Sequence, residues 1–326
     1  MKIPVPIKFG ISGEKRCILR NADESVIYDS GWSDNLITNQ GLQNMLEGGT
    51  LGNANWGVWW SVGSSSTPPA VTDTTHGAFL KWFNGSTGVS AVKTNSGSNN
   101  YIMSHTDSRR WNSGDGSGTV REFGLGSTTT GTDLSIHTAV SPEVVKANDQ
   151  ILEFYYRMTC TPVIADQTGS FTLDNKGTPV TYYYIARPIR LDQTTFSIIN
   201  GQFRETSTPQ IFDGNINPDI GTAGVTNPSG DVQSLTGVGN EFFGLSITVD
   251  AGAGTGTRNW RQNISVDNGN FAGGVRSIRC PFQFMSQTGT GIQVQYGDAP
   301  GATGNAIPKT ANDKIELDFQ LTITRT

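Results

Sequence analysis

The sequence predicts an all-β protein of two antiparallel β-sandwich domains, jelly-roll-like, with long Gly/Ser/Thr loops and one short helix near the N-terminus. Three observations predict this class. Charged residues make up 16 % of the 326 residues, against a usual share of about 25 %. Glycine accounts for 40 residues, which is about 12 % against a usual share of about 7 %. Apolar and polar residues alternate at period two in several segments. Short motifs recur about half a chain apart.

The composition also indicates a folded chain. The 15 Phe, 8 Tyr and 7 Trp residues supply enough aromatic side chains to close a hydrophobic core. Disordered chains lack such residues, so we expect the chain to fold despite its high content of Gly, Ser, Thr and Asn.

Uninterrupted alternation predicts half-buried strands at residues 315–323 and 152–158. Residues 171–173 and 181–185 flank a segment with the order Asp-Asn-Lys-Gly-Thr-Pro, which predicts a β-hairpin with a glycine turn.

One helix is predicted over residues 36–46. Asp34 or Asn35 would cap its start, and Gly48 and Gly49 would end it. The Gly/Ser/Thr/Asn-rich segments 84–100, 114–131 and 207–240 are interpreted as long loops, which in compact domains usually carry function or become ordered by a partner.

An internal echo suggests two related domains. Ala-Asn-Asp stands at residues 147–149 and again at 311–313, each time as a turn before an alternating strand. Upstream of both copies lie a Trp beside an Arg and then Gly-x-Val-Arg, in the same order. We therefore divide the chain into an N-terminal β-sandwich domain, residues 1–165, and a C-terminal one, residues 166–326, interpreted as a duplication of the first.

Net charge, the length of the apolar runs and the cysteine pattern argue against several classes of protein. The formal charge of −5 argues against general nucleic-acid binding. The longest apolar run, residues 182–186, is far shorter than the roughly 20 residues of a membrane helix, and residues 1–7 do not have the apolar core of a secretion signal. Cys17, Cys160 and Cys280 are isolated, which indicates free thiols in a reducing compartment.

No catalytic residue, metal site or cofactor is predicted. His76, His105 and His137 are about 30 residues apart and are interpreted as polar loop residues. The nucleophile-elbow pattern Gly-x-Ser-x-Gly does not occur in the sequence.

Two further site types have candidate residues. A glycosidase would need a carboxylate pair such as Glu122 with Glu153 or Asp213 with Asp219, but no sequence feature brings either pair together. The acidic segments 107–115 and 213–219 do not match an ordered calcium loop.

Four of the seven tryptophans, Trp56, Trp59, Trp60 and Trp82, fall within 27 positions. Residues 56–62 are interpreted first as a core strand, with a protein interface and a sugar-stacking surface as alternatives. Trp59 points to the opposite face of such a strand, so Trp59 and Trp82 are interface candidates.

Residues 31–42 (Gly-Trp-Ser-Asp-Asn-Leu-Ile-Thr-Asn-Gln-Gly-Leu) resemble the opening of tail-associated structural proteins of tailed bacteriophages. The Pro-containing stretch 62–74, the segments 120–125 and 149–156, and the hairpin 166–188 continue the same order, so the resemblance covers about residues 20–190. It implies a fibre, collar or baseplate-type virion component of β-sandwich domains, without enzymatic activity. The chain has no shaft-like repeat, which favours a compact piece bound to the particle.

The function predicted is therefore that of a structural protein carried on a phage virion, made in the bacterial host cytoplasm and acting through protein–protein assembly. Its partners would be other virion proteins and copies of itself, without nucleic acid or membrane insertion. Ile3, Val5 and Ile7 alternate with Lys and Pro and are interface candidates on an extended arm. The alternative is a carbohydrate-binding or depolymerising module that contacts host-surface glycan.

Overall fold

The computed structural model describes residues 2–47, 59–83, 88–95, 101–163, 165–175, 177–189, 203–205, 210–216, 228–234, 242–284 and 287–326. Strands account for 60 % of it and form three sheets, and α1 (Asn39–Glu47) is the one helix of these residues. The predicted all-β class is therefore confirmed.

In chain order, the strands are β1 (Lys2–Arg20), β2 (Val26–Asp29), β3 (Ser33–Asp34), β4 (Leu36–Ile37), β5 (Trp59–Gly63), β6 (Phe79–Phe83), β7 (Gly88–Asn95), β8 (Tyr101–Trp111), β9 (Gly118–Gly126), β10 (Leu134–Lys146), β11 (Ile151–Pro162), β12 (Gln167–Asn175), β13 (Thr178–Ile189), β14 (Phe203–Glu205), β15 (Gln210–Phe212), β16 (Val232–Ser234), β17 (Phe242–Asp250), β18 (Thr255–Ile264), β19 (Ser277–Phe284), β20 (Gln287–Gly297) and β21 (Ile315–Arg325).

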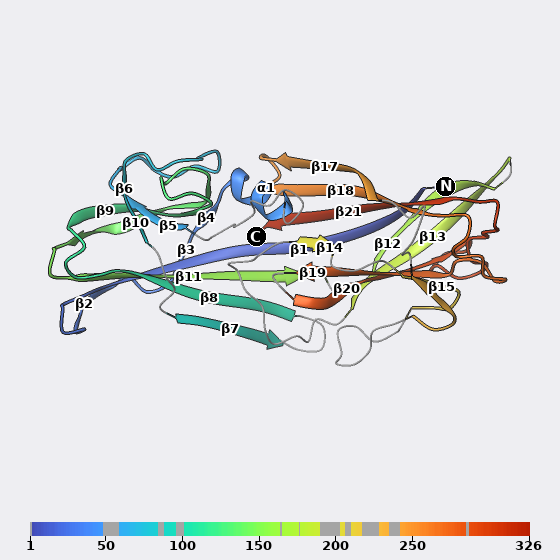
Figure 1. Cartoon of the computed structure of the whole chain (residues 1–326), viewed down its shortest axis with the longest axis horizontal. Helices are drawn as coiled ribbons and strands as arrows, with labels where there is room; N and C mark the ends of the chain where they lie inside the picture. Colours follow the sequence, from blue (N-terminus) through green and yellow to red (C-terminus); the bar gives the residue numbers. More distant parts are fainter. Residues whose placement is uncertain are drawn as a thin grey trace.

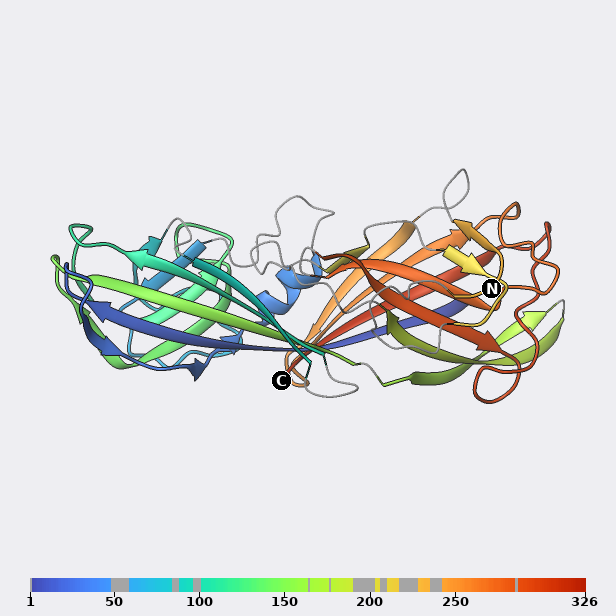
Figure 2. The same cartoon turned by 90° about the horizontal axis from the view of Figure 1, so that it is seen from below.

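The long strand β1 runs along the molecule and belongs to both of its lobes (Figures 1 and 2). Its first part, residues 2–11, pairs in parallel with β21, and its second part, residues 9–20, pairs antiparallel with β11. A nine-stranded sheet with the path β17-β18-β21-β1-β11-β8-β7 therefore extends through both lobes. Since β1 pairs with strands from both sides of residue 165, the two-domain division stays a prediction.

Each lobe adds a sheet of its own, and the two lobes repeat one pairing pattern. The order β4-β10-β9-β5-β6 in the five-stranded sheet corresponds to β13-β20-β19-β15-β16 in the seven-stranded sheet. In the nine-stranded sheet, β7-β8-β11 corresponds to β17-β18-β21. The echoed Ala-Asn-Asp turns directly precede β11 and β21, as the sequence predicts.

The core lies between the nine-stranded sheet and the smaller sheets. In the left-hand lobe of Figure 1, Phe123 of β9 stacks on Phe154 of β11 with ring centroids 4.6 Å apart, and Trp60 of β5 meets Phe123 edge to face. In β21 alternate side chains from Ile315 to Ile323 are buried, as its period-two pattern predicts. Offset and edge-to-face aromatic pairs add stabilisation beyond the area they bury.

The predicted hairpin is also confirmed. Strands β12 and β13 pair with Phe171 opposite Tyr182, and the turn places Gly177 at φ 86°. The amide of Gly177 donates to Asp174 Oδ1 at 2.7 Å, which is how an Asp side chain stabilises a tight turn.

The predicted helix is present, but its predicted start is wrong. Leu36 and Ile37 form β4, which pairs with β10, and the helix begins only after Thr38. The Thr38 hydroxyl accepts the Gly41 amide at 2.9 Å, so Thr38 is the N-cap in place of Asp34 or Asn35.

Helix α1 lies at the waist between the lobes (Figure 2). The hydroxyl of its N-cap Thr38 donates to the carbonyl oxygen of Leu134, the first residue of β10 in the left-hand lobe. At its other end, the guanidinium of Arg258 on β18 donates to Leu46 O at 3.0 Å. Hydrogen bonds at both ends thus fix the helix to one strand of each lobe.

Glycine 41 allows α1 to pack against β10. A Cβ at this position would overlap the Ser135 carbonyl oxygen and lie 2.9 Å from its carbon, and this backbone cannot move aside as a side chain could. We expect Gly41→Ala to destabilise the fold by about 1–3 kcal/mol, although the same change in an exposed helix stabilises by about 1 kcal/mol. Urea unfolding checks the sign, with Gln43→Ala on the exposed face as the control; a stabilised Gly41→Ala chain would contradict this packing.

Two of the expected long loops each contain a strand. Segment 114–131 contains β9, and segment 84–100 contains β7. Close packing requires glycine at position 124 of β9, because a Cβ there would lie 2.9 Å from the Leu134 side chain and 3.1 Å from the His76 ring. In segment 207–240 only β15, β16 and short flanks fall within the described residues.

Cys17 and Cys160 are buried free thiols, as predicted, while the side chain of Cys280 lies outside the described residues. Burial raises the pKa of both thiols. In the part of the chain that the structure describes, no helix has the length and apolar character needed to cross a bilayer.

Candidate functional site

The candidate site lies on the outer face of the five-stranded sheet. Register places Ser61, Gly124 and His137 in one row across β5, β9 and β10, and Gly63 with Glu122 in the next row. The alternate residues of these strands, such as Trp60 and Phe123, point into the core. The polar residues therefore occupy the face that period-two alternation assigns to solvent.

This face is covered by the connection between β5 and β6. The connection carries His76, which is held over β9 and β10 by backbone hydrogen bonds from His76 N to Gly131 O and from Leu134 N to Thr74 O, both 3.1 Å. As a result the side chains of His76, Glu122 and His137 are at most 3 % exposed. We call these three residues the His–Glu cluster.

The three side chains meet at close range. His137 Nε2 lies 3.1 Å from Glu122 Oε1, and His76 Nδ1 lies 3.8 Å from Glu122 Oε2. One potential ligand atom from each residue lies within 4.8 Å of those of the other two. The outward ring nitrogens are also partnered: His137 Nδ1 is 2.8 Å from Asp73 Oδ2, and His76 Nε2 is 2.7 Å from Ser61 Oγ.

Backbone amides hold the Glu122 carboxylate in place. Gly77 N donates to Oε1 at 2.9 Å, and Ser65 N and Ala78 N donate to Oε2 at 3.2 and 3.3 Å. These donors all belong to the covering connection, so the same carboxylate fixes that connection to β9.

Space around the cluster depends on glycine. A Cβ on Gly63 would overlap Glu122 Oε2 and lie 3.0 Å from His76 Nδ1, and a Cβ on Gly131 would lie 2.9 Å from the His76 ring. Gly63 therefore leaves open the volume between the carboxylate and the His76 ring.

Burial and the neighbouring His137 lower the pKa of His76 to about 4, against the opposing effect of Glu122. The unfolded chain, with an ordinary histidine pKa of about 6.5, binds this proton first as pH falls. Stability from neutral His76 is therefore complete above about pH 6.5 and is lost progressively towards pH 4.

We expect the free energy of unfolding to fall by roughly 3 kcal/mol over this interval through His76. Urea titrations between pH 7 and pH 4 in EDTA, where no metal ion competes with the proton, measure this loss. His76→Gln should flatten the pH profile. Parallel profiles for the variant and the wild type would contradict the assignment to His76.

The contacts Ser61–His76–Glu122 follow the order of a serine nucleophile, a base and an acid. Ser61 is 1 % exposed, however, and its hydroxyl is also within 3.4 Å of Gly124 O. A substrate cannot reach this hydroxyl without displacing the covering connection. The His–Glu cluster instead brings imidazole nitrogens and a carboxylate together inside the protein, away from substrate.

The prediction that the three histidines lie on loops is wrong for His105 and His137. His105 lies on β8 and His137 on β10, His76 lies in the connection before β6, and all three are buried. The error has a physical cause: the connection that covers the sheet has no periodic signal, and segment 114–131, which contains β9, was interpreted as a loop. The one sequence feature that could have indicated the site is the position of Glu122 and His137 on the outer face of the neighbouring strands β9 and β10.

The interface candidates have different surroundings. Trp59 and Trp82 are half-buried on the outer face and pack edge to face at 4.9 Å, so Trp59 does lie opposite Trp60. The backbone of Ile3, Val5 and Ile7 lies in β1 and pairs with β21 of the same chain, while their side chains lie outside the described residues. An interface role for these five residues stays a prediction.

The candidate carboxylate pair does not face a common cleft. Glu122 belongs to the His–Glu cluster, whereas Glu153, on β11, is buried and pairs with Arg20 and Arg110. Asp213 accepts the Asp231 amide at 2.7 Å, and Asp219 lies outside the described residues.

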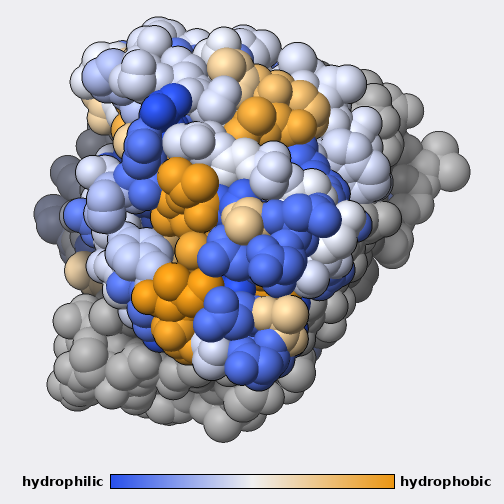
Figure 3. Space-filling view, turned by 90° about the vertical axis from the view of Figure 1, so that its left-hand side faces the viewer, coloured by the Kyte–Doolittle hydropathy of each residue, from blue (hydrophilic) through white to orange (hydrophobic). Residues whose placement is uncertain are grey.

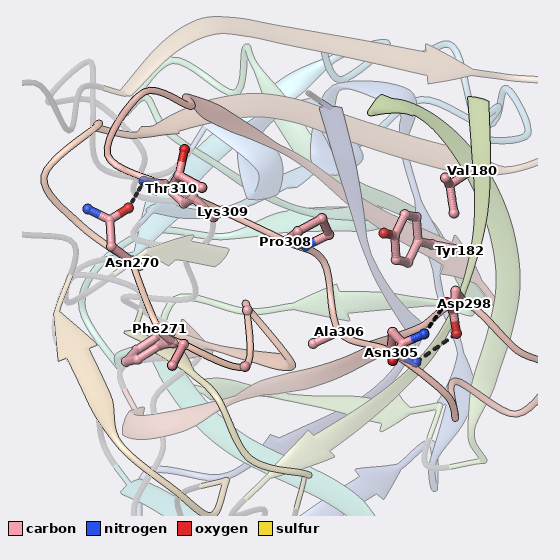
Figure 4. A pocket seen from close by; sticks show the side chains of 13 residues that line it. Val180, Tyr182, Asn270, Phe271, Asp298, Asn305, Ala306, Pro308, Lys309 and Thr310 are labelled. Carbon is pink, nitrogen blue, oxygen red and sulfur yellow. Dashed lines mark hydrogen bonds between the residues drawn. The ribbon is translucent and has the colours of Figure 1, made fainter. Parts of the chain in front are cut away.

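A pocket of about 620 Å³ opens in the other lobe between β13 and the loops before β19 and β21 (Figure 4). Its polar groups largely bind one another: Asn305 donates to Asp298 at 2.7 and 2.9 Å, and Lys309 donates to Asn270 at 2.9 Å. Its Tyr182 ring is only 3 % exposed, so it does not offer an open face for sugar stacking.

Comparisons with protein families, with characterised proteins and with solved structures gave no match for this chain.

Proposed function

We propose that this chain is a non-enzymatic structural component of a tailed-phage virion, made in the host cytoplasm and carried on the particle through contacts with other virion proteins. The resemblance of residues 20–190 to tail-associated proteins suggests the class. The observation that carries the proposal is an apolar surface at one end of an elongated β-molecule.

Several apolar patches lie between hydrophilic residues on that end of the molecule (Figure 3). Large exposed hydrophobic side chains lie on β2, β6 and β10, which the left-hand lobe of Figure 1 contains: Val26, Ile27, Phe79, Leu80 and Val145, each 38–61 % exposed. Monomeric soluble proteins rarely keep large apolar patches in water, so such a surface supports docking to a partner.

An edge strand adjoins this surface. Among the described strands β6 pairs with β5 alone, and it carries the exposed residues Phe79 and Leu80. An unpaired strand edge can accept a strand from another chain through main-chain hydrogen bonds. This supports assembly with copies of the chain or with other virion proteins.

We also propose that the two lobes are duplicated β-sandwich domains of jelly-roll type, divided near residue 165. The repeated pairing pattern and the echoed turns before β11 and β21 support the duplication.

Assembly is tested by sedimentation of the full chain. We expect the wild type to self-associate or to bind purified tail or collar proteins, and a variant with Ile27→Lys and Val145→Lys to lose that association. Glu47→Lys, remote on α1, is the matched charge control. A wild-type chain that stays monomeric and binds none of these proteins would contradict the proposal.

Host-cell adsorption separates the alternative function. The isolated chain is incubated with host cells and with purified surface polysaccharide. Specific adsorption or release of reducing ends would favour the glycan-directed module over the structural role. Absence of both is the expected result.

A further inference from the structure

We propose that the His–Glu cluster binds one divalent transition-metal ion, with Zn²⁺ as the favoured occupant, through His76 Nδ1, His137 Nε2 and the Glu122 carboxylate. This inference is independent of the proposed function. It rests on the direction of the ring nitrogens, the spacing of the donor atoms and the charge of the buried cluster.

The outer hydrogen bonds set which ring nitrogens face the centre. With a metal ion bound, His137 would carry its proton on Nδ1, 2.8 Å from Asp73 Oδ2, and its Nε2 electron pair would then face the centre, 3.1 Å from Glu122 Oε1. His76 Nε2–H donates to Ser61 Oγ, whose own proton is directed to Gly124 O, which leaves the Nδ1 electron pair inside. The Asp73 carboxylate on the outer nitrogen of His137 is the usual support of a metal-ligating histidine.

Without a bound cation, one buried nitrogen at the centre of the His–Glu cluster has no hydrogen-bond donor within the described ranges. Among the described residues, His76 Nδ1 finds no hydrogen-bond partner although its side chain is fully buried. His76 Nδ1, His137 Nε2 and a Glu122 oxygen thus meet in a buried centre in which no described hydrogen-bond donor reaches His76 Nδ1. Buried polar atoms of this kind are rarely left unpaired, so an ion coordinated by all three accounts for the arrangement.

The spacing suits a small cation. Ligands about 2.0–2.2 Å from a tetrahedral zinc ion lie roughly 3.4 Å from one another. The separations of 3.1 and 3.8 Å between Glu122 and the two rings bracket this value. The volume that Gly63 leaves open adjoins both Glu122 Oε2 and His76 Nδ1.

Charge and donor type indicate the kind of metal. Glu122 and Asp73 together carry two negative charges, which a divalent ion would balance. Two imidazole nitrogens and one carboxylate favour Zn²⁺ or a related transition metal over Ca²⁺ or Mg²⁺, which prefer all-oxygen sites. The burial of all three ligands indicates a structural ion that holds the β5–β6 connection on β9 and β10.

The test uses the full chain, stripped with a chelator and then titrated with Zn²⁺ alone. We expect about one Zn²⁺ per chain by elemental analysis after dialysis, and Co²⁺ in its place should give the visible absorption of a low-symmetry nitrogen–oxygen site. His76→Ala and Glu122→Gln should each abolish stoichiometric retention and the Co²⁺ spectrum. Asp73→Asn should weaken Zn²⁺ binding by about 10–100-fold.

His105→Gln is the matched control, since it removes another buried histidine outside the cluster. It should retain Zn²⁺ as the wild type does. Circular dichroism shows whether each variant is folded, and the wild-type titration decides the matter even where a variant does not fold.

A stripped wild-type chain that retains no Zn²⁺ and gives no Co²⁺ spectrum would overturn the proposal. Retention that persists equally in folded His76→Ala and Glu122→Gln would overturn it as well. None of these outcomes depends on assembly, so failure of the metal site and failure of the proposed function are distinguishable.

Discussion

Replacing Asp107 with leucine is expected to lower the free energy of unfolding by about 3–5 kcal/mol, because it leaves the buried charge of Arg109 without its carboxylate. Both side chains are at most 5 % exposed, and Arg109 Nη1 lies 2.8 Å from Asp107 Oδ2. The guanidinium also lies over the Trp60 ring, 5.2 Å from its centroid, inside the left-hand lobe. Urea unfolding measures the loss.

A double variant distinguishes the effect of the unpaired Arg109 charge from the effect of lost packing. Asp107→Leu combined with Arg109→Met removes both charges while keeping apolar volume, and such replacements are often close to neutral. We expect it to recover most of the stability that Asp107→Leu loses. A double variant as unstable as the single one would show that the ion pair is not the cause.

Phe123→Ala is expected to cost about 3–5 kcal/mol, the usual range for a buried phenylalanine. Phe123 is fully buried, stacks on Phe154 at 4.6 Å and meets Trp60 at 5.5 Å, so its removal leaves a cavity between the two sheets of the lobe. Chemical unfolding is the measurement.

The control for Phe123→Ala is Val145→Ala on the neighbouring strand β10. Val145 is 61 % exposed, and its truncation should change stability by no more than about 0.5 kcal/mol. A cost below about 1 kcal/mol for Phe123→Ala would contradict a close-packed core between β9 and β11.

Local patterns predicted β21 and the β12–β13 hairpin. The alternation from Ile315 to Ile323 and the turn at Gly177 depend on neighbours in sequence, and β21 and the β12–β13 hairpin follow them. The helix start was misplaced because Asp34 and Asn35 are good caps in isolation. Pairing of Leu36 and Ile37 with β10 moved the start to Thr38.

The candidate site could not be predicted from the same patterns. His76 and Glu122 are 46 positions apart, and only strand order and the path of the β5–β6 connection bring them together. Period two distinguishes the two faces of β9, but it does not show that a chain segment covers the outer one. Glycines in β9 were interpreted as loop residues although they make room for His76 and Leu134.

The proposed place of the chain on a phage particle is tested most directly by electron microscopy with a gold-labelled antibody against it. The proposal predicts label at one fixed position, on the tail, collar, baseplate or capsid surface, of every intact virion. Particles that carry no label, while the same antibody recognises the free chain in the lysate, would contradict it.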